Sequence, residues 1–271
     1  MALPATGTTF KEGGFGTVDN RLYSRGPLAA VLIRDERGAD TDISPYKAGT
    51  PPTVNWSPLA QDYNLRSDLF AQILVDGQWT TNHASNDGWW IIGALDEGNG
   101  PERKPSIKKD DAMILQSNFP FDTDTTSEGI EISFTGVEVY KPLMKRLRMN
   151  QPLSTSAGVS LVEDIGEDGF VISKPVAADA INRQILLVFA KARSGGYIYD
   201  VEGYPLCKLT DIGAAKRSKT NPDAHSLGFT VLPSPYHVDK DPGDPTSGHL
   251  VPALYSEWLG GDAWSAMGAT S

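Results

Sequence analysis

The sequence contains only one cysteine, Cys207, in 271 residues. A lone cysteine cannot form a disulfide within its own chain, which excludes the small disulfide-stapled folds of secreted proteins. A nucleophilic thiol needs a base such as histidine beside it, and the sequence shows no such partner for Cys207. We therefore expect Cys207 to be a buried thiol.

Long apolar runs and targeting signals are also missing. The longest run, Ile185–Ala190, is far shorter than the ~18 residues of a membrane span and instead predicts a buried strand. The start, Met1–Ala5, has no basic region followed by an apolar core, so it does not predict a signal peptide. We expect a protein that is made and kept in the cytosol and has no membrane partner.

Positive charge is scarce. Lys and Arg number 24 against 34 Asp and Glu, which gives a net charge of −10. This balance argues against a protein that holds nucleic acid tightly, because such proteins present clustered cations to the phosphates. It is compatible with a surface along which DNA slides, since a negative wall repels phosphate.

Catalytic motifs are absent as well. The sequence has no Gly-x-Ser-x-Gly elbow, phosphate-binding loop or dinucleotide fingerprint, and no histidine pair at metal-ligand spacing. We expect neither an enzyme nor a cofactor, although a carboxylate pair for glycoside hydrolysis stays open because such pairs come from separate strands. We interpret the histidines as solvated or hydrogen-bonded loop residues; they are His83, His225, His237 and His249.

Two acidic groups are candidate calcium sites. Neither has the glycine and terminal glutamate spacing of an EF-hand loop, so we interpret both as solvated turn carboxylates. The groups are Asp122, Asp124 and Glu128, and Asp239, Asp241 and Asp244.

The sequence is rich in turn-forming residues, and one stretch alternates apolar with polar residues. Its 27 Gly and 19 Pro exceed average usage, as is typical of all-β proteins. Within 128–140, Ile130, Ile132 and Phe134 alternate with polar residues, which is the period of a half-buried strand. At Gly136 the alternation shifts by one residue, which predicts a β-bulge.

Further strands are predicted where short apolar runs lie between turn residues. Gly195 and Gly196 separate two of these runs and indicate a tight hairpin. The charged stretch 101–111 and the polar stretch 213–226 are interpreted as exposed loops. The expected strands are 28–34, 69–75, 89–92, 112–116, 170–173, 183–192, 196–201 and 227–232.

One helix is predicted after the 128–140 strand. Pro142 suits a first helical turn, and Leu143, Met144 and Leu147 recur on one face of Lys141–Met149. The other face is basic. In an acidic protein we interpret it as a solvated surface or a subunit contact rather than a nucleic-acid site.

Four stretches, taken in order, resemble the major tail tube proteins of long-tailed (siphovirus-type) bacteriophages, and are most similar to those of phages infecting actinobacteria. They frame residues 88–237, more than half of the chain. The stretches are Gly88–Gly98, Leu115–Asn118, Glu131–Thr135 with the helix Lys141–Met149, and Ser226–Tyr236.

This resemblance implies a mainly β protein, with a tail-tube-type β-sandwich or barrel, one flanking α-helix and long loops or arms. It implies a single domain, 1–271, with an N-terminal arm or long-loop region 1–68 and a C-terminal extension 236–271. Six copies would form a ring, and stacked rings a hollow tube through which DNA is ejected. Its partners would be further copies, the tape measure protein and tail terminator or tip proteins. The protein would be assembled in the host bacterial cytoplasm and reside in the virion.

Within that interpretation, Glu131 and Glu138 are expected to face the lumen. Trp56 is expected to be buried against a partner copy, whereas Trp258 and Trp264 are expected to pack on this subunit or on another copy. Seven residues in all are expected in ring-stacking or subunit contacts. They are Trp56, Asp96, Glu97, Lys216, Arg217, Trp258 and Trp264. The alternatives are another phage structural protein (a capsid-decoration or head–tail connector protein) and a carbohydrate-binding β-sandwich, suggested by the tryptophan-rich loops.

Overall fold

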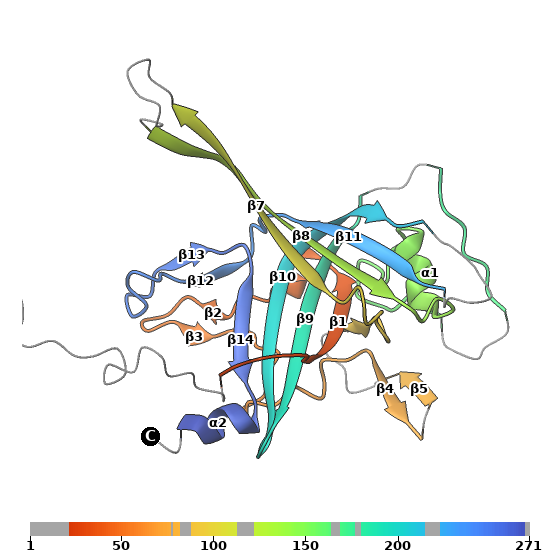
Figure 1. The fold of residues 1–271 in the computed structure, drawn as a ribbon, viewed down its shortest axis with the longest axis horizontal. Coiled ribbons are helices and arrows are strands. Elements are labelled where there is room, and N and C mark those ends of the chain that lie inside the picture. The colour runs from red at the N-terminus through yellow and green to blue at the C-terminus, as the bar shows by residue number, and fades with distance from the viewer. Residues whose placement is uncertain are drawn as a thin grey trace, which may run out of the picture.

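The computed structural model describes residues 22–76, 78–81, 88–112, 122–163, 169–176, 180–214 and 223–268. The fold is mainly β, as expected, and centres on one large antiparallel sheet (Figure 1). Its strands, in spatial order, are β6 (Trp90–Ile91), β1 (Leu28–Asp35), β9 (Asn182–Arg193), β10 (Gly196–Ile212), β11 (His225–Val231), β8 (Asp122–Gly136) and β7 (Glu102–Ala112), with β14 (Ser256–Gly260) also pairing with β10.

Smaller elements surround this sheet. Three two-stranded ribbons are formed by β2 (Tyr46–Lys47) with β3 (Thr53–Val54), β4 (Gln72–Val75) with β5 (Gln78–Thr81), and β12 (Val238–Lys240) with β13 (Leu250–Pro252). The helical elements are the 3₁₀ turn η1 (Gly38–Thr41), α1 (Pro142–Arg148) and α2 (Asp262–Gly268). No helix in the ranges given above is long and apolar enough to cross a membrane.

The β9–β10 hairpin forms the centre of the sheet, as the paired glycines predict. Gly195 and Gly196 both have positive φ, at 99° and 134°, and Gly196 pairs directly with Arg193 across the turn. Glycine adopts such angles without the steric cost that a Cβ would add. The run Ile185–Val188 is buried on both faces, because Ile185 and Leu187 belong to one apolar cluster and Leu186 and Val188 to another on the opposite face.

The large sheet closes on itself. The chain beyond β6 crosses to β8, where the Asp96 amide donates to the Thr135 carbonyl at 2.9 Å and the Val137 amide donates to the Ala94 carbonyl at 3.0 Å. Leu95 and Gly136 form an antiparallel bridge between these bonds. The β6 end of the sheet is therefore joined to β8, next to the last strand, and a barrel, one of the two expected forms, encloses an apolar core.

A small polar latch holds this closure. Gly93 has a φ of 102°, and a Cβ there would lie 2.2 Å from a carboxylate oxygen of Glu138. That carboxylate accepts the Ala94 amide at 3.0 Å, and the Lys141 ammonium lies 3.7 Å away while donating to the Ile91 carbonyl at 2.7 Å. Burial lowers the pKa of Lys141, and the nearby Glu138 opposes this shift.

The barrel interior is packed by α1 and by the inward residues of the strands. Ile130, Ile132 and Phe134 are buried as the alternation predicts, and the Phe134 ring stacks on Phe229 with centroids 5.7 Å apart. Helix α1 begins at Pro142, as predicted. Its buried face is the expected one, formed by Leu143, Met144 and Leu147.

A second apolar cluster lies on the outer face of β1, β9 and β10. Residues 43–70 fold over this face, so that Trp56 is only 9% exposed. Its ring lies 6.3 Å from Trp89 and 5.4 Å, edge-on, from Trp258. The expectation that Trp56 is buried against a partner copy is corrected here, because its own subunit already covers it. Trp258 is likewise partly buried within the subunit.

Several expected elements differ from the structure. The charged stretch 101–111 is not a loop but most of strand β7, because it pairs with β8 from Glu102 to Ala112, with one register shift between Lys108 and Lys109. Residues 170–173 belong to no strand, and Phe170 and Val171 are exposed. Strand β8 ends at Gly136 without the expected bulge. Helix α2 was not anticipated, and the expected strand 112–116 lies almost wholly outside the described residues.

The buried polar groups also differ in part from expectation. Cys207 is fully buried, as expected, and burial raises its pKa. His225 is buried within β11 rather than in a loop, whereas His237 is a hydrogen-bonded loop residue, as one of the two expected settings has it, and is also buried. Burial lowers the pKa of each. The His237 ring lies 3.0 Å from the hydroxyl of Ser256, at the start of β14. Of the other two, His249 is exposed and His83 lies outside the described residues.

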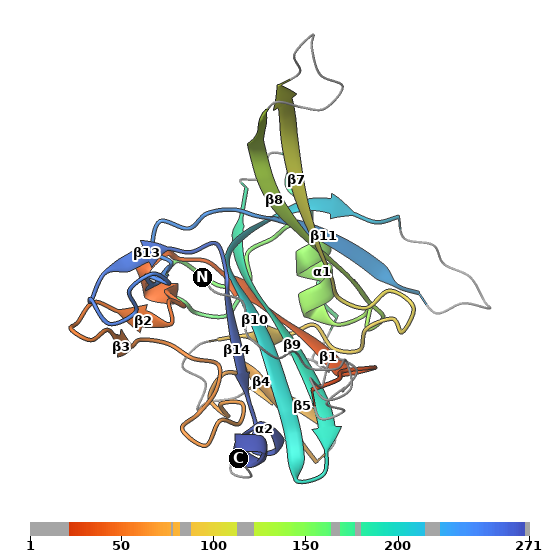
Figure 2. The same ribbon diagram turned by 60° about the vertical axis from the view of Figure 1, so that its left-hand side comes forward.

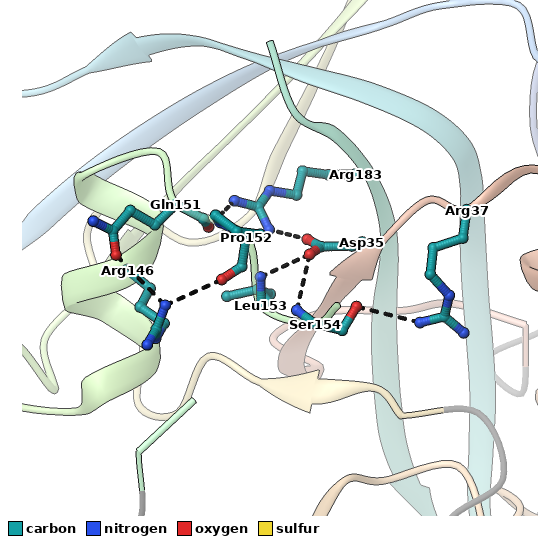
Figure 3. A network of polar contacts seen from close by, with 8 residues as sticks. All are labelled: Asp35, Arg37, Arg146, Gln151, Pro152, Leu153, Ser154 and Arg183. Atoms are coloured by element: carbon teal, nitrogen blue, oxygen red, sulfur yellow. Dashed lines mark hydrogen bonds and ion pairs between the residues drawn. The ribbon is translucent and has the colours of Figure 1, made fainter. Parts of the chain in front are cut away.

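A buried ion pair ties the loop after α1 to the sheet (Figure 3). Arg183 and Asp35 are cross-strand partners on β9 and β1, are 1% and 5% exposed, and form an ion pair. The second Asp35 oxygen accepts the amides of Leu153 and Ser154 at 2.7 and 3.0 Å, and Arg183 also donates to the Gln151 carbonyl at 2.5 Å. Each charge is therefore satisfied by several groups.

Removing one partner of this pair should destabilise the protein strongly. Asp35→Ala leaves a buried guanidinium and two amides without their acceptor, and we expect the free energy of unfolding to fall by about 3–5 kcal/mol. Urea denaturation measures this loss. The matched control is Asp68→Ala, which removes the more exposed partner of Arg66 and should cost about 1 kcal/mol or less. Equal effects of the two substitutions would contradict the assigned role of Asp35.

Candidate assembly surfaces

The distal part of β7 and β8 projects from the barrel as a two-stranded ribbon. Figures 1 and 2 show it standing clear of the remaining elements from both directions. It pairs from Ile107 with Glu128 to Ala112 with Asp122, and residues 104–111 and 122–128 are exposed. An isolated two-stranded ribbon is marginally stable in water at best. Contact with another surface would therefore stabilise this ribbon.

The outer edge of the ribbon resists simple strand addition. Strand β7 carries Lys104, Lys108 and Lys109, together with Pro105, which has no amide hydrogen to offer. Lysine and proline are the residues that usually blunt an exposed edge. We infer that the ribbon contacts a partner through its side chains rather than by extending a sheet along β7.

An ionic cluster anchors the base of the ribbon to the barrel. The Arg103 guanidinium lies 2.7 Å from Glu257 on β14 and 3.4 Å from Glu202 on β10. The Tyr204 hydroxyl donates to the other Glu202 oxygen at 2.5 Å, and burial raises the pKa of Glu202. Arg103 also lies 5.3 Å above the Tyr255 ring. One cation from β7 thus holds carboxylates from two strands of the barrel wall.

The second surface is an apolar groove beside the ends of β9 and β10 that their turn connects, and beside β14 and α2. It comprises two adjoining cavities, of about 360 and 530 Å³, which share Leu22, Leu259 and Trp264. Five of the fifteen exposed large hydrophobic residues of the described chain line it: Leu22, Tyr23, Tyr63, Leu259 and Trp264. A patch of this kind typically marks an interaction site. Helix α2 and the adjoining end of β14, which carry Trp264 and Leu259 of the groove, lie at the opposite end of the molecule from the ribbon in both views (Figures 1 and 2).

The residues expected in the lumen occupy different settings. Glu131 is exposed on the outer face of β8, and Lys104 lies directly opposite it on β7. Glu138 lies beyond the end of the strand, where its carboxylate forms the closing latch of the barrel. The two residues therefore do not share one polar strand face, because the strand on which that expectation depends ends at Gly136.

The residues expected in subunit contacts are also dispersed. Asp96 and Glu97 lie in the turn that leads from the barrel closure into β7; the Asp96 carboxylate accepts a hydrogen bond from the Asn99 side-chain amide at 2.5 Å, and Glu97 is exposed. Trp264 lies in the apolar groove and is 37% exposed. Lys216 and Arg217 lie outside the described residues.

The acidic groups weighed as calcium sites do not gather in space. Asp122 and Asp124 follow one another along the exposed ribbon, whereas Asp241 accepts the Gly243 amide at 2.8 Å and contacts the His249 ring at 3.2 Å. In the part of the chain described here, no three His, Cys, Asp or Glu side chains form a group that could hold a metal ion.

Sequence reasoning missed both the ribbon and its anchor. Neither face of the distal ribbon is buried, so its strands show no alternation of apolar and polar residues. The one available signal was the threonine-rich composition of the start of β8, since threonine favours strands. In the Arg103 cluster, Glu202 and Glu257 lie about 100 and 150 positions from Arg103 in the sequence, so no local sequence pattern predicts the cluster.

Loss of the Arg103 anchor should loosen the base of the ribbon. We expect Arg103→Ala to speed amide hydrogen exchange at 102–104 and 130–133, because Glu202 and Glu257 then repel each other without a cation between them. Lys104→Ala, at the neighbouring exposed position, is the control and should change exchange little. Identical exchange in the two variants would remove Arg103 from this role.

Comparisons with known proteins add little to this geometry. No family model and no curated protein matches the chain. One solved structure, described as "Crystal structure of Hcp protein", aligns with 86% of this chain and 100% of that chain at a TM-score of 0.28 and 10% sequence identity. A likeness at that level carries no argument, so the fold class and the candidate surfaces rest on the strands and contacts described above.

Proposed function

We propose that this chain is a structural protein that assembles with copies of itself into stacked rings, and that these form a phage tail tube. The observation that carries this proposal is the ribbon of β7 and β8, which extends well beyond the barrel and exposes both of its faces. A ribbon of this kind is costly to expose unless another molecule contacts it. We therefore assign it the contact between neighbouring copies.

The sequence at the end of the ribbon supports the same assignment. The connection between its strands, residues 113–121, contains Met113, Ile114, Leu115, Phe119 and Phe121. Several large apolar residues placed between two polar exposed strands are typical of a contact that forms on assembly. The ribbon projects from one end of the molecule (Figures 1 and 2). A contact between it and a different surface of the next copy would be head-to-tail, and this geometry builds rings and filaments rather than closed pairs.

The finer parts of the proposal follow from the resemblance of the sequence to tail tube proteins. They are six copies per ring, passage of DNA through the lumen, and contacts with a tape measure protein and with tail terminator or tip proteins. The net charge of −10 supports a lumen that DNA passes without being held. We further propose that the assembled protein resides in the virion and that it is not an enzyme.

Removal of the distal ribbon should abolish assembly without unfolding the barrel. We would replace residues 108–127 by Asn-Gly, which joins the paired residues Ile107 and Glu128 through a two-residue turn. We expect the wild type to form rings or tubes in size-exclusion chromatography and electron microscopy, and the variant to remain monomeric with an unchanged thermal unfolding midpoint.

The control is the same kind of replacement in another hairpin. Replacing residues 242–248 by Asn-Gly shortens the connection between β12 and β13 next to the Asp241–His249 backbone hydrogen bond. This variant should still assemble. A wild-type protein that stays monomeric at high concentration and all salt conditions, or tubes that form without the ribbon, would count against the proposal. A protein that stays small but is retained on glycan columns would favour the carbohydrate-binding alternative.

The charge of Glu131 provides a test of the lumen. If the outer face of β8 lines the channel, Glu131→Lys should leave tubes intact and slow DNA ejection, most at low salt where attraction to phosphate is least screened. The double variant Glu131→Lys with Lys104→Glu exchanges the two opposed charges and should eject DNA nearly as the wild type does. Ejection that is unaffected by Glu131→Lys at every ionic strength would place this face outside the lumen.

A further inference from the structure

The apolar groove lies where the N-terminal segment of the chain emerges. The described chain begins at Leu22, and its side chain lines both cavities of the groove. Residues 22–27 then run across β14, β10 and β9 toward β1 (Figure 1), on the face of β9 that carries Phe189, Lys191 and Arg193. The described chain therefore begins at the rim of an exposed apolar surface, and 21 residues of the sequence precede Leu22.

The sheet already binds the start of this segment through its backbone. Lys191 donates to the Arg25 carbonyl, and an Arg193 Nη donates to the Tyr23 carbonyl. Both cations lie on β9 and line the groove. These contacts recognise an extended main chain rather than particular side chains, so the same face is suited to bind more of the segment.

One donor on this face lacks an acceptor. The Arg193 Nε atom is buried and has no hydrogen-bond partner within the ranges that the structure describes. Buried N–H groups in folded proteins are nearly always satisfied. A carbonyl supplied by a further piece of chain lying in the groove would satisfy this N–H group.

We propose that residues 1–21 of the same chain dock in the apolar groove, with Phe15 as the anchor. Phe15 lies in the run Gly13-Gly14-Phe15-Gly16, whose glycines permit the backbone to turn back toward the groove. The seven residues from Leu22 to Phe15 span up to about 23 Å when extended, which is ample for a turn back onto Trp264 and Leu259. Attachment at the rim gives the segment an effective concentration of the order of millimolar.

A rival occupant is the ribbon connection of a second copy, residues 113–121. Three observations favour the N-terminal segment of the same chain: Leu22 already lines the groove, the two backbone contacts continue toward it, and its covalent attachment makes binding independent of concentration. The inference does not depend on tube formation, because a protein that never assembles would still form this contact.

Disulfide trapping in the full-length chain tests the inference. We expect Phe15→Cys with Leu259→Cys to form an intramolecular disulfide on mild oxidation of dilute protein, identified by a monomer band on a non-reducing gel and by mass spectrometry. Cys207 is fully buried and does not interfere. The control pairs Phe15→Cys with Tyr140→Cys, an 82% exposed position beside α1, and should not cross-link. The rival occupant, residues 113–121 of a second copy, is tested by a variant that combines Ile114→Cys with Leu259→Cys.

A second measurement uses the groove itself. Deletion of residues 1–20 should increase binding of a hydrophobic dye, and a synthetic peptide of residues 1–21 should reverse the increase; circular dichroism confirms that the variant is folded. Absence of the Phe15–Leu259 cross-link, or its appearance only between molecules, overturns the inference. A cross-link from Ile114 to Leu259 between copies would also overturn it while supporting the proposed tube. If the deletion variant does not fold, the cross-linking result alone decides.

Discussion

The closure of the barrel is the constraint on which the rest of the structure depends. Two backbone hydrogen bonds join residues 94–96 to the end of β8, and they form only because Gly93 turns sharply enough for Glu138 to lie against it. Lys141 holds that carboxylate and the Ile91 carbonyl together, at the point where α1 begins. The latch therefore connects the first strands, the longest strand and the covering helix, and it encloses an apolar core that an open sheet would leave in water.

Closure also explains why the ribbon projects. The last residues of β8 are paired on one side with β11 and on the other with residues 94–96, so β7 can pair with β8 only from Ser133 outward. Both strands then continue past the barrel with no further neighbour. The Arg103 cluster secures the point of departure, since it joins β7 to carboxylates on β10 and β14. The projection of the ribbon is thus a geometric consequence of the closure of the barrel.

Buried polar pairs hold the loops on either face of the sheet. Asp35 and Arg183 secure the loop after α1, and at the adjacent register position Arg34 and Gln184 both donate to the Thr41 carbonyl on the opposite face. Adjacent residues of a strand point to opposite faces, so two successive cross-strand pairs anchor one loop on each side. Such pairs add less net stability than apolar packing does, and their contribution here is to select one position for each loop.

The sequence by itself determined the elements whose signal is local. The alternation of Ile130, Ile132 and Phe134, the apolar face of α1 and the paired glycines between β9 and β10 each report a single element and its buried side. Only the tertiary structure decided what depends on distant partners: that the polar stretch 101–111 becomes a strand, that Trp56 is covered by Trp89 and Trp258, and that Glu138 closes a barrel instead of extending a strand face. The physical reason is that hydrophobic period reports burial, whereas pairing, closure and ionic contacts depend on which residues the folded chain brings together.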